Sequence, residues 1–281
     1  MQHRLLEDDA RDILAKAIFG LGLSVADLAD RSGLPLPTVM AATGKSAYPA
    51  FTSIPDPAWL ALAAATGLDG RALVAIVRGH YRPVLALPAW LACITTRQRM
   101  LEVNAWIAAD PATGRAVIID TGADARPLLG HLARNQWKAE VLLLTHDHPD
   151  HIACLADLVA AIPGLSVYSP AADFVTGTRV VPDTGIIETG AGRIHCLPTP
   201  GHTDGGTSYL IDSTSPSVCF VGDALFAGSI GGPRHSYPEA LAAIRTHILP
   251  LPGDCVLCPG HGPATTVALE SAHNPYFSST P

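Results

Sequence analysis

The chain has 281 residues, 48% of them hydrophobic and 15% charged, with a formal net charge of −7 at pH 7. This composition is typical of a well-buried globular protein and excludes an intrinsically disordered chain. The acidic balance argues against a general nucleic-acid-binding surface, and no apolar run approaches the ~20 residues of a membrane-spanning helix, so we expect no membrane partner.

The start of the chain and its cysteines indicate the compartment. Residues 1–9 turn acidic where a signal peptide requires an apolar core. The six cysteines are scattered through apolar stretches, which is more typical of reduced core residues than of a disulfide framework. We therefore expect a cytoplasmic protein.

Residues 1–82 are predicted to form a small all-α domain. Five short helices are indicated by apolar residues at helical spacing and by capping residues at their starts. They cover Arg11–Phe19, the stretch that follows the capping box Ser24–Asp27, Thr38–Ala42, Trp59–Thr66, and a last helix capped by Asp69.

Two segments, Ser24–Ala29 and Gly33–Val39, resemble a helix-turn-helix module of the lambda-repressor-like type. The resemblance makes a transcriptional regulator with a ligand-sensing metal domain the non-enzymatic alternative. A DNA reader needs Arg, Lys, Asn or Gln along its third helix, whereas the nearest cation here is Lys45, just beyond it. Residues 1–82 hold eight Lys+Arg and eight Asp+Glu, so the charge that phosphate binding requires is missing. We expect packing, homodimerisation or covering of a cleft instead of DNA binding.

A domain boundary is predicted near residues 79–88, where glycine and prolines interrupt the helical pattern. Residues 83–281 then form a second domain. Residues 101–108 and 116–119 have the pattern of strands separated by a turn, and a helix is predicted over 127–135.

The segment Thr145–His151 contains three histidines and two aspartates directly after the apolar run Val141–Leu144, which has the pattern of a buried strand. A helix is predicted from near Asp150 to before Pro163. The cluster therefore lies in a turn at the carboxyl end of a strand, and imidazole and carboxylate are ligands that zinc, iron and manganese accept. The alternative is a solvated turn that holds its histidines by chance.

Three further predicted strands end in the same way. Each runs into glycine and then a residue that can bind a metal, as in Gly201-His202, Gly222-Asp223 and Gly260-His261. Glycine lets the backbone turn tightly, so the next side chain can point over the sheet edge. Four strand ends that present ligands predict one shared site.

The ligands of these four strand ends form a pattern that resembles the metallo-β-lactamase-fold hydrolases over about residues 84–281. They are His146, His148, Asp150, His151, His202, Asp223 and His261. The segments Gly201–Gly206, Gly222–Phe226 and Pro259–Gly262 are most similar to the glyoxalase II (hydroxyacylglutathione hydrolase) branch. The resemblance implies an α/β fold, an αββα sandwich with the metals at one edge.

The resemblance also implies two divalent metal ions, with zinc as first choice and iron or manganese as alternatives. Carried over by position, the first ion would be held by His146, His148 and His202, and the second by Asp150, His151 and His261, with Asp223 between them. A bridging hydroxide would attack a thioester or ester carbonyl of a small-molecule acyl substrate. Asp150 is the candidate that takes up or relays the proton.

Departures from related patterns narrow the activity. Class B1 β-lactamases resemble this pattern with cysteine at the position of Asp223, and the lactonases carry tyrosine where this chain has Phe226. Larger glyoxalase II enzymes add a basic glutathione-binding domain, whereas the cation near the cleft here is Arg234. We predict a thioester or activated-acyl hydrolase, with a mononuclear-iron persulfide dioxygenase or a lactonase as the alternatives.

Other polar residues have weaker patterns. Arg234, His235 and Tyr237 fall in the segment expected to border the cleft and are substrate-binding candidates, with a surface loop as the alternative. Asp120 and Asp147 are candidates to orient metal-binding histidines, or else they form ordinary turns.

Overall fold

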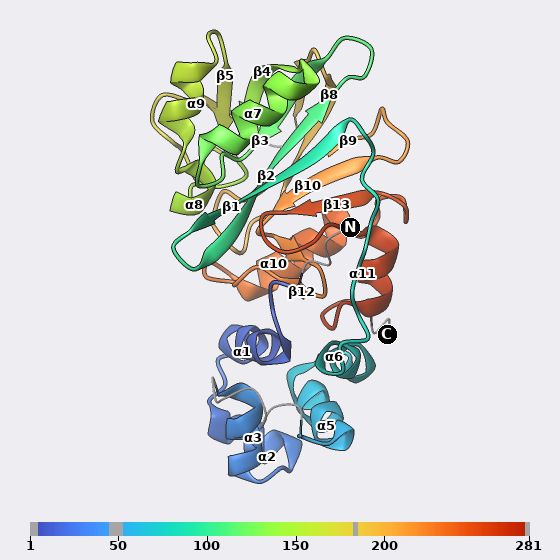
Figure 1. Ribbon diagram of the computed structural model, residues 1–281. Helices are drawn as coiled ribbons and strands as arrows, with labels where there is room; N and C mark the ends of the chain where they lie inside the picture. Colours follow the sequence, from blue (N-terminus) through green and yellow to red (C-terminus); the bar gives the residue numbers. More distant parts are fainter. Residues whose placement is uncertain (1–4, 45–52, 182–184, 279–281) are drawn as a thin grey trace.

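The structure is a computed structural model that describes residues 5–44, 53–181 and 185–278 (Figure 1). Its first part is helical, as the sequence predicts. The described helices of this part are α1 (Ala10–Gly20), α2 (Val25–Ser32), α3 (Leu36–Thr43), α5 (Asp56–Thr66) and α6 (Gly70–Val77). In Figure 1 they lie together at one end of the molecule, below the strands.

Capping residues fix where these helices begin and end. The predicted capping box opens α2: the Ser24 hydroxyl accepts from the Asp27 amide at 3.1 Å, and the Asp27 carboxylate accepts from the Ser24 amide at 2.8 Å. The same arrangement opens α1. Gly33, with φ +66°, ends α2 and starts the turn into α3. Lys45, the cation nearest to the predicted third helix, lies outside the described residues.

The first sheet has the strand order β1-β2-β3-β4-β5-β6. Its strands are β1 (Leu91–Gln98), β2 (Leu101–Ala109), β3 (Arg115–Ile119), β4 (Lys138–Leu143), β5 (Ser166–Ser169) and β6 (Arg179–Val180). The first three strands are antiparallel neighbours, and β3 to β6 are parallel. Parallel neighbours need crossover connections, and three helices in these connections pack on the outer face of the sheet. They are α7 (Ala125–Asn135), α8 (Pro149–Ile152) and α9 (Leu155–Ala161).

The second sheet has the strand order β14-β13-β10-β9-β8-β7. Its strands are β7 (Ile186–Thr189), β8 (Gly192–Pro198), β9 (Thr207–Ile211), β10 (Val218–Gly222), β13 (Val256–Pro259) and β14 (Thr265–Thr266). Only β10 and β13 pair in parallel among these described strands. A small hairpin of β11 (Leu225–Phe226) and β12 (Ser229–Ile230) follows β10, and three helical segments follow later in the chain. These are α10 (Tyr237–Ala243), η1 (Ile244–Ile248) and α11 (Val267–His273).

The two sheets pack face to face with helices on both outer sides, which confirms the predicted αββα sandwich. Alternate residues of a strand point to opposite faces, so Phe220 of β10 joins Trp106 and Tyr209 in the core between the sheets. Val221, one residue on, joins the core on the other face of the second sheet. Trp106 and Phe220 lie with ring centroids 6.3 Å apart. The strand ends that carry the predicted ligands are thereby fixed by a buried core.

The helix predicted from Asp150 onward is not continuous, which corrects that prediction. It is divided into α8 and α9 near Cys154. The carbonyl of His151 accepts hydrogen bonds from the Thr121 amide at 2.8 Å and the Thr121 hydroxyl at 3.0 Å, and the Cys154 amide donates to the same hydroxyl at 3.1 Å. Thr121 thus takes the place of the helical partners and holds His151 at the end of a single turn.

The N-terminal helices share an apolar core with the second sheet. Ile13 of α1 and Trp59 of α5 belong to the same buried cluster as Val221 and Leu257. The Tyr276 hydroxyl also donates to the Ile13 carbonyl at 2.8 Å. The predicted domain boundary between residues 82 and 83 stays a prediction, because residues from both sides of it share one buried apolar cluster. No helix among the described residues is both long and apolar enough to cross a bilayer.

Candidate metal centre

The seven predicted ligands converge at one edge of the sandwich. They follow the carboxyl ends of β4, β8, β10 and β13, so residues far apart in the sequence meet in one place. Their ligand atoms form two groups, within each of which all atoms lie within 4.8 Å of one another. The first group is His146, His148, His202 and Asp223, and the second is Asp150, His151 and His261.

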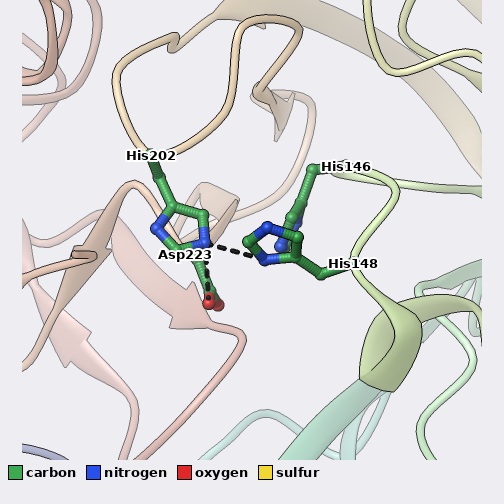
Figure 2. A group of neighbouring side chains, drawn as sticks. All are labelled: His146, His148, His202 and Asp223. Carbon is green, nitrogen blue, oxygen red and sulfur yellow. Dashed lines mark hydrogen bonds and ion pairs between the residues drawn. The ribbon is translucent and has the colours of Figure 1, made fainter. Parts of the chain in front are cut away.

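In the first group three imidazoles lie close to one another and to one carboxylate (Figure 2). His202 Nε2 lies 3.0 Å from His148 Nδ1 and 3.5 Å from Asp223 Oδ2. The ring centroids of His146 and His202 are 5.1 Å apart, with the ring planes at 87°. These nitrogens therefore face a common point beside Asp223.

The second group lies on the other side of Asp223. His261 Nε2 is 3.2 Å from Asp150 Oδ2, and His151 Nε2 is 3.9 Å from the same oxygen. Asp223 reaches both groups: its Oδ1 is 3.3 Å from His151 Nε2, and its Oδ2 is 3.5 Å from both His202 Nε2 and His261 Nε2. One carboxylate thus lies between two sets of nitrogen ligands.

Three buried polar atoms in this space have no hydrogen-bond partner: His146 Nε2, His151 Nε2 and Asp223 Oδ1. The last two are 3.3 Å apart but are not aligned for a hydrogen bond. Buried polar atoms without partners are costly, and a bound cation would satisfy all three at once. Three imidazoles with a carboxylate, and two with a carboxylate, are donor sets that zinc, iron and manganese accept. The residues present fit two metal ions.

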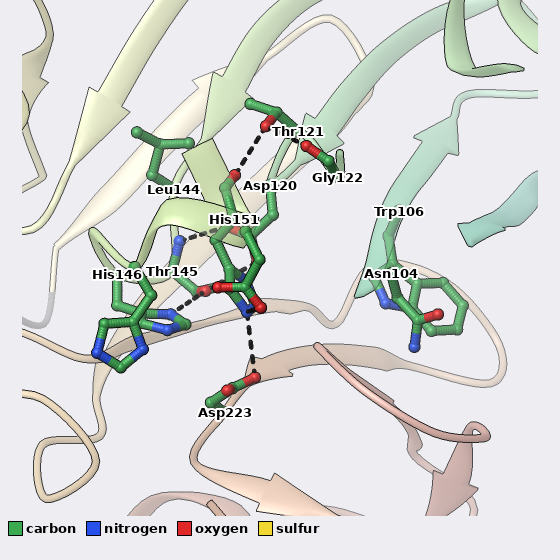
Figure 3. A network of polar contacts seen from close by, with 12 residues as sticks. Asn104, Trp106, Asp120, Thr121, Gly122, Leu144, Thr145, His146, His151 and Asp223 are labelled. Carbon is green, nitrogen blue, oxygen red and sulfur yellow. Dashed lines mark hydrogen bonds and ion pairs between the residues drawn. The ribbon is translucent and has the colours of Figure 1, made fainter. Parts of the chain in front are cut away.

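The outer nitrogens of the histidines are held by polar contacts (Figure 3). Asp120 Oδ2 accepts from His151 Nδ1 at 2.8 Å, and the Asp120 carboxylate also accepts from the amide and the hydroxyl of Thr145, both at 2.8 Å. The Thr145 hydroxyl in turn lies 3.0 Å from His146 Nδ1. Asp120 therefore orients one histidine directly and a second through Thr145, as predicted for this residue, whereas Asp147 is exposed.

Backbone carbonyls hold two further histidines. His202 Nδ1 donates to the Gly232 carbonyl at 2.7 Å, and His261 Nδ1 donates to the Glu102 carbonyl at 2.5 Å. In both cases Nε2 is left to face the centre. The sequence gives no signal for these acceptors, because any residue type can supply a carbonyl.

Asp120 adopts a left-handed backbone conformation, with φ +57°. This region is unfavourable for residues other than glycine, although aspartate tolerates it better than most. Its amide donates to the Leu143 carbonyl at 2.9 Å, so the surrounding strands hold the conformation. Local strain of this kind is common at functional sites.

Gly260 lets the two ligand groups approach each other. A Cβ atom at this position would lie 2.3 Å from Asp223 Oδ1 and 2.5 Å from His151 Cε1. Any side chain there would displace one of these predicted ligands, so the glycine before His261 is required by space.

The two ligand groups differ in their protonation. Burial lowers the pKa of His146 well below its ordinary value and also lowers the pKa of His202, so both are neutral imidazoles. Burial alone would lower the pKa of His151 and His261 too, but Asp223 and a second carboxylate raise these pKa values to about 10 and about 11. A metal ion entering the second group must therefore displace protons from its histidines.

The family-model comparison decides the family. Residues 99–261, more than half of the chain, match the model described as the metallo-beta-lactamase superfamily. The chain belongs to the metallo-beta-lactamase superfamily. The match ends at His261, the last of the seven predicted ligands.

Relatives within this superfamily include hydrolases. The chain is 34% identical over 149 residues to a hydroxyacylglutathione hydrolase from Salmonella dublin, an alignment that covers 53% of this chain and 57% of that relative's length. A structure described as the BLEG-1 B3 metallo-beta-lactamase matches with 30% identity and a TM-score of 0.59, over 67% of this chain and 100% of that one. TTHA1623, in a di-iron-bound form, matches with 27% identity and a TM-score of 0.58, over 66% and 100% of the two chains.

The predicted substrate candidates lie in different surroundings. Arg234 is exposed, and His235 Nε2 lies 3.4 Å from Asp204 Oδ1 and 3.5 Å from Glu239 Oε2. Tyr237 instead packs on α1: a Cβ atom at Gly20 would lie 2.2 Å from its ring. Their roles toward substrate stay predictions.

Cavity size alone does not locate the site. Beside the first ligand group is a cavity of only about 10 Å³, lined by His146, His202 and Asp223 among others. A cavity of about 420 Å³ lies against the segment Pro83–Leu87, and one of about 390 Å³ lies near Asp110 and Gly190. Neither of these larger cavities is lined by any of the seven ligands.

Proposed function

We propose that this protein is a dinuclear metal-dependent hydrolase that cleaves a thioester or another activated acyl compound. The observation that supports this most directly is Asp223, whose two carboxylate oxygens face two separate groups of nitrogen ligands at 3.3–3.5 Å. A carboxylate placed in this way can serve two ions together.

Two divalent ions held here would supply a nucleophilic hydroxide at neutral pH and polarise an acyl carbonyl. The residues of the chain hold the donor atoms in place and exclude water from behind them, since His146, His151 and Asp223 are buried. Zinc is the first choice, and iron or manganese would suit the same donors.

Asp150 is the residue we assign to the proton. Its side chain is 13% exposed, and its Oδ2 lies 3.2 Å from His261 Nε2. Burial alone would raise the pKa of Asp150, but the hydrogen bond from His261 and the neighbouring imidazolium charges lower it. An ionised carboxylate at the open side of the centre can accept a proton from an incoming nucleophile and pass it to a leaving group.

The thioester class is favoured by the hydroxyacylglutathione hydrolase relatives, of whose length this chain spans about 57%. Specificity for glutathione is not part of the proposal. Larger glyoxalase II enzymes bind glutathione with several basic residues, whereas Arg234 is the single cation that we assign to the cleft segment. The carboxylate at position 223 in place of cysteine argues against class B1 β-lactamase activity, and Phe226 in place of tyrosine argues against lactone hydrolysis.

A panel of activated acyl substrates tests this proposal. Zinc-loaded protein is expected to hydrolyse acyl thioesters, including S-lactoylglutathione and an acyl-coenzyme A, with higher kcat/KM than a homoserine lactone or a β-lactam. Free thiol release is followed by a colorimetric reagent. Absence of turnover on every thioester would contradict the proposal. Oxygen consumption with glutathione persulfide by protein that holds one iron would favour the dioxygenase alternative.

The N-terminal helices are proposed to support the metal centre, not to bind DNA. Helix α3, which would be the reading helix, has no charged residue, and its exposed side chains include Leu36 and Met40. Without Arg or Lys on that helix, phosphate contacts would have to come from elsewhere. A homodimer built on this exposed apolar surface is the remaining alternative role.

A further inference from the structure

Two residues near the start of the chain, Asp8 and Lys16, contact the segment that precedes Gly231 and Gly232 beside the candidate metal centre. Asp8 is only 8% exposed, and its carboxylate accepts hydrogen bonds from the Ser229 hydroxyl at 2.5 Å and from the Lys16 ammonium. Lys16 also donates to the Ile230 carbonyl at 2.7 Å and lies over the Phe226 ring, 5.0 Å from its centroid. The Lys16 side chain is 16% exposed, and an ammonium with so little exposure is stabilised by pairing. Its contacts with Asp8, Ile230 and Phe226 and the Asp8–Ser229 hydrogen bond form one connected unit.

The residues that Lys16 and Asp8 contact are close in sequence to the carbonyl that orients His202. Ile230 is followed by Gly231 and Gly232, and the Gly232 carbonyl is the acceptor that orients His202 through Nδ1 at 2.7 Å. Gly231 lies against the bridging aspartate: a Cβ atom there would be 1.7 Å from the Asp223 carbonyl oxygen. The position of this short segment therefore sets the direction of the His202 ring.

The two glycines have no side chains to hold them, although the Gly231 amide donates to the Ala224 carbonyl at 3.3 Å and Ile230 pairs with Leu225 in the β11–β12 hairpin. The segment is held at its start, where Lys16 binds the Ile230 carbonyl and Asp8 binds the Ser229 hydroxyl, and where Asn274 Nδ2 donates to the Ser229 carbonyl at 2.9 Å. Two of these three side-chain anchors come from the N-terminal part of the chain, more than 200 residues away in sequence.

We infer that Lys16 and Asp8 are positioning residues for His202, so that the N-terminal helical part is a structural component of the first metal site. The same stretch also meets the loop of His261, since a Cβ atom at Gly262 would lie 3.1 Å from the Glu7 amide nitrogen. That second contact is backbone packing, whereas the Lys16 and Asp8 contacts are directed hydrogen bonds. The inference concerns metal binding and does not depend on which acyl compound is cleaved.

Cobalt binding tests the inference without an activity assay. The measurement is made in a His261→Ala background, in which the first ligand group alone is complete. The Co²⁺ affinity is obtained by competition with a chelator, and the visible absorption spectrum reports the ligand geometry. Lys16→Met is compared with Lys16→Arg, which keeps the charge and the donors, and with Lys138→Met, which replaces an exposed lysine at the start of β4.

Lys16→Met is expected to weaken Co²⁺ binding by about 10-fold and to change the visible spectrum, because outer contacts of metal-binding histidines are worth about 10–100-fold in affinity. Lys16→Arg should recover most of the affinity, and Lys138→Met should match the parent protein. If Lys16→Met does not fold, Ser229→Ala removes one anchor at no cost in charge and carries the same prediction with a smaller effect. Unchanged affinity and spectrum in the folded variant would overturn the inference.

Discussion

Asp223→Asn is expected to lower kcat/KM for thioester hydrolysis by roughly 100- to 1,000-fold, the range that loss of one electrostatic group at a reacting centre produces. The substitution keeps the shape of the side chain but removes the negative charge that faces His151, His202 and His261. Bound metal should fall below the value of the parent protein, because an amide in place of the shared carboxylate would bind a cation in either ligand group more weakly. Kinetics and elemental analysis on the same preparation measure both effects.

Asp212→Asn is the matched control for this change. Asp212 is an exposed carboxylate whose Oδ2 lies 3.1 Å from His195 Nε2, outside both ligand groups. It should retain the parent rate and metal content. A full metal complement and an unchanged rate in Asp223→Asn would show that the carboxylate does not join the two groups.

Glu270→Ala is expected to lower the free energy of unfolding by about 3 kcal/mol or more, since each buried group left without its partner costs about 1–3 kcal/mol. The Glu270 carboxylate is fully buried and accepts from the Tyr81 hydroxyl, from Thr265 Oγ1 at 2.7 Å, from the Gly228 amide at 2.9 Å and from Asn274 Nδ2 at 2.8 Å. Its removal leaves the Gly228 amide and one N–H of Asn274 without an acceptor in the core, and it leaves the Tyr81 and Thr265 hydroxyls with only each other as partners. Urea denaturation followed by circular dichroism measures the change.

Glu270→Gln separates the charge from the hydrogen bonds. Burial raises the pKa of Glu270 by more than its hydrogen bonds lower it, so the pKa in the folded state is above the ordinary value. The folded state then binds the proton more tightly than the unfolded state, whose pKa is about 4.3, and stability falls as the pH rises through the folded-state value. Glu270→Gln should lose less stability than Glu270→Ala and should lack this pH dependence. A change of less than about 0.5 kcal/mol in Glu270→Ala, typical of surface positions, would contradict the account.

The residues of the candidate metal centre could be predicted from the sequence because each is marked locally. Four of them lie in one dense segment after an apolar run, and each of the other three follows a glycine near the end of a predicted strand. The capping box at Ser24 is equally local. Because imidazole and carboxylate are common metal ligands, four strand ends that carry them predict a metal site.

The supports of the site could not be predicted in the same way. The carbonyls of Glu102 and Gly232 orient two ligands, but a carbonyl leaves no mark in the residue type. The break after α8 depends on Thr121, thirty residues earlier in the chain, and the hydrogen bond of Lys16 joins residues separated by 214 positions. These contacts exist only once the sandwich has formed, so the sequence pattern does not reveal them.

Metal content per chain, measured on protein purified without added metal and paired with thioester turnover, tests the central claim most directly. Two zinc ions per chain, with turnover that is lost on chelation and restored on reloading, is the predicted result. One ion per chain that saturates activity would contradict the dinuclear centre, because Asp223 and the second ligand group would then have no role in hydrolysis. Turnover that persists after complete metal removal would contradict metal-dependent hydrolysis altogether.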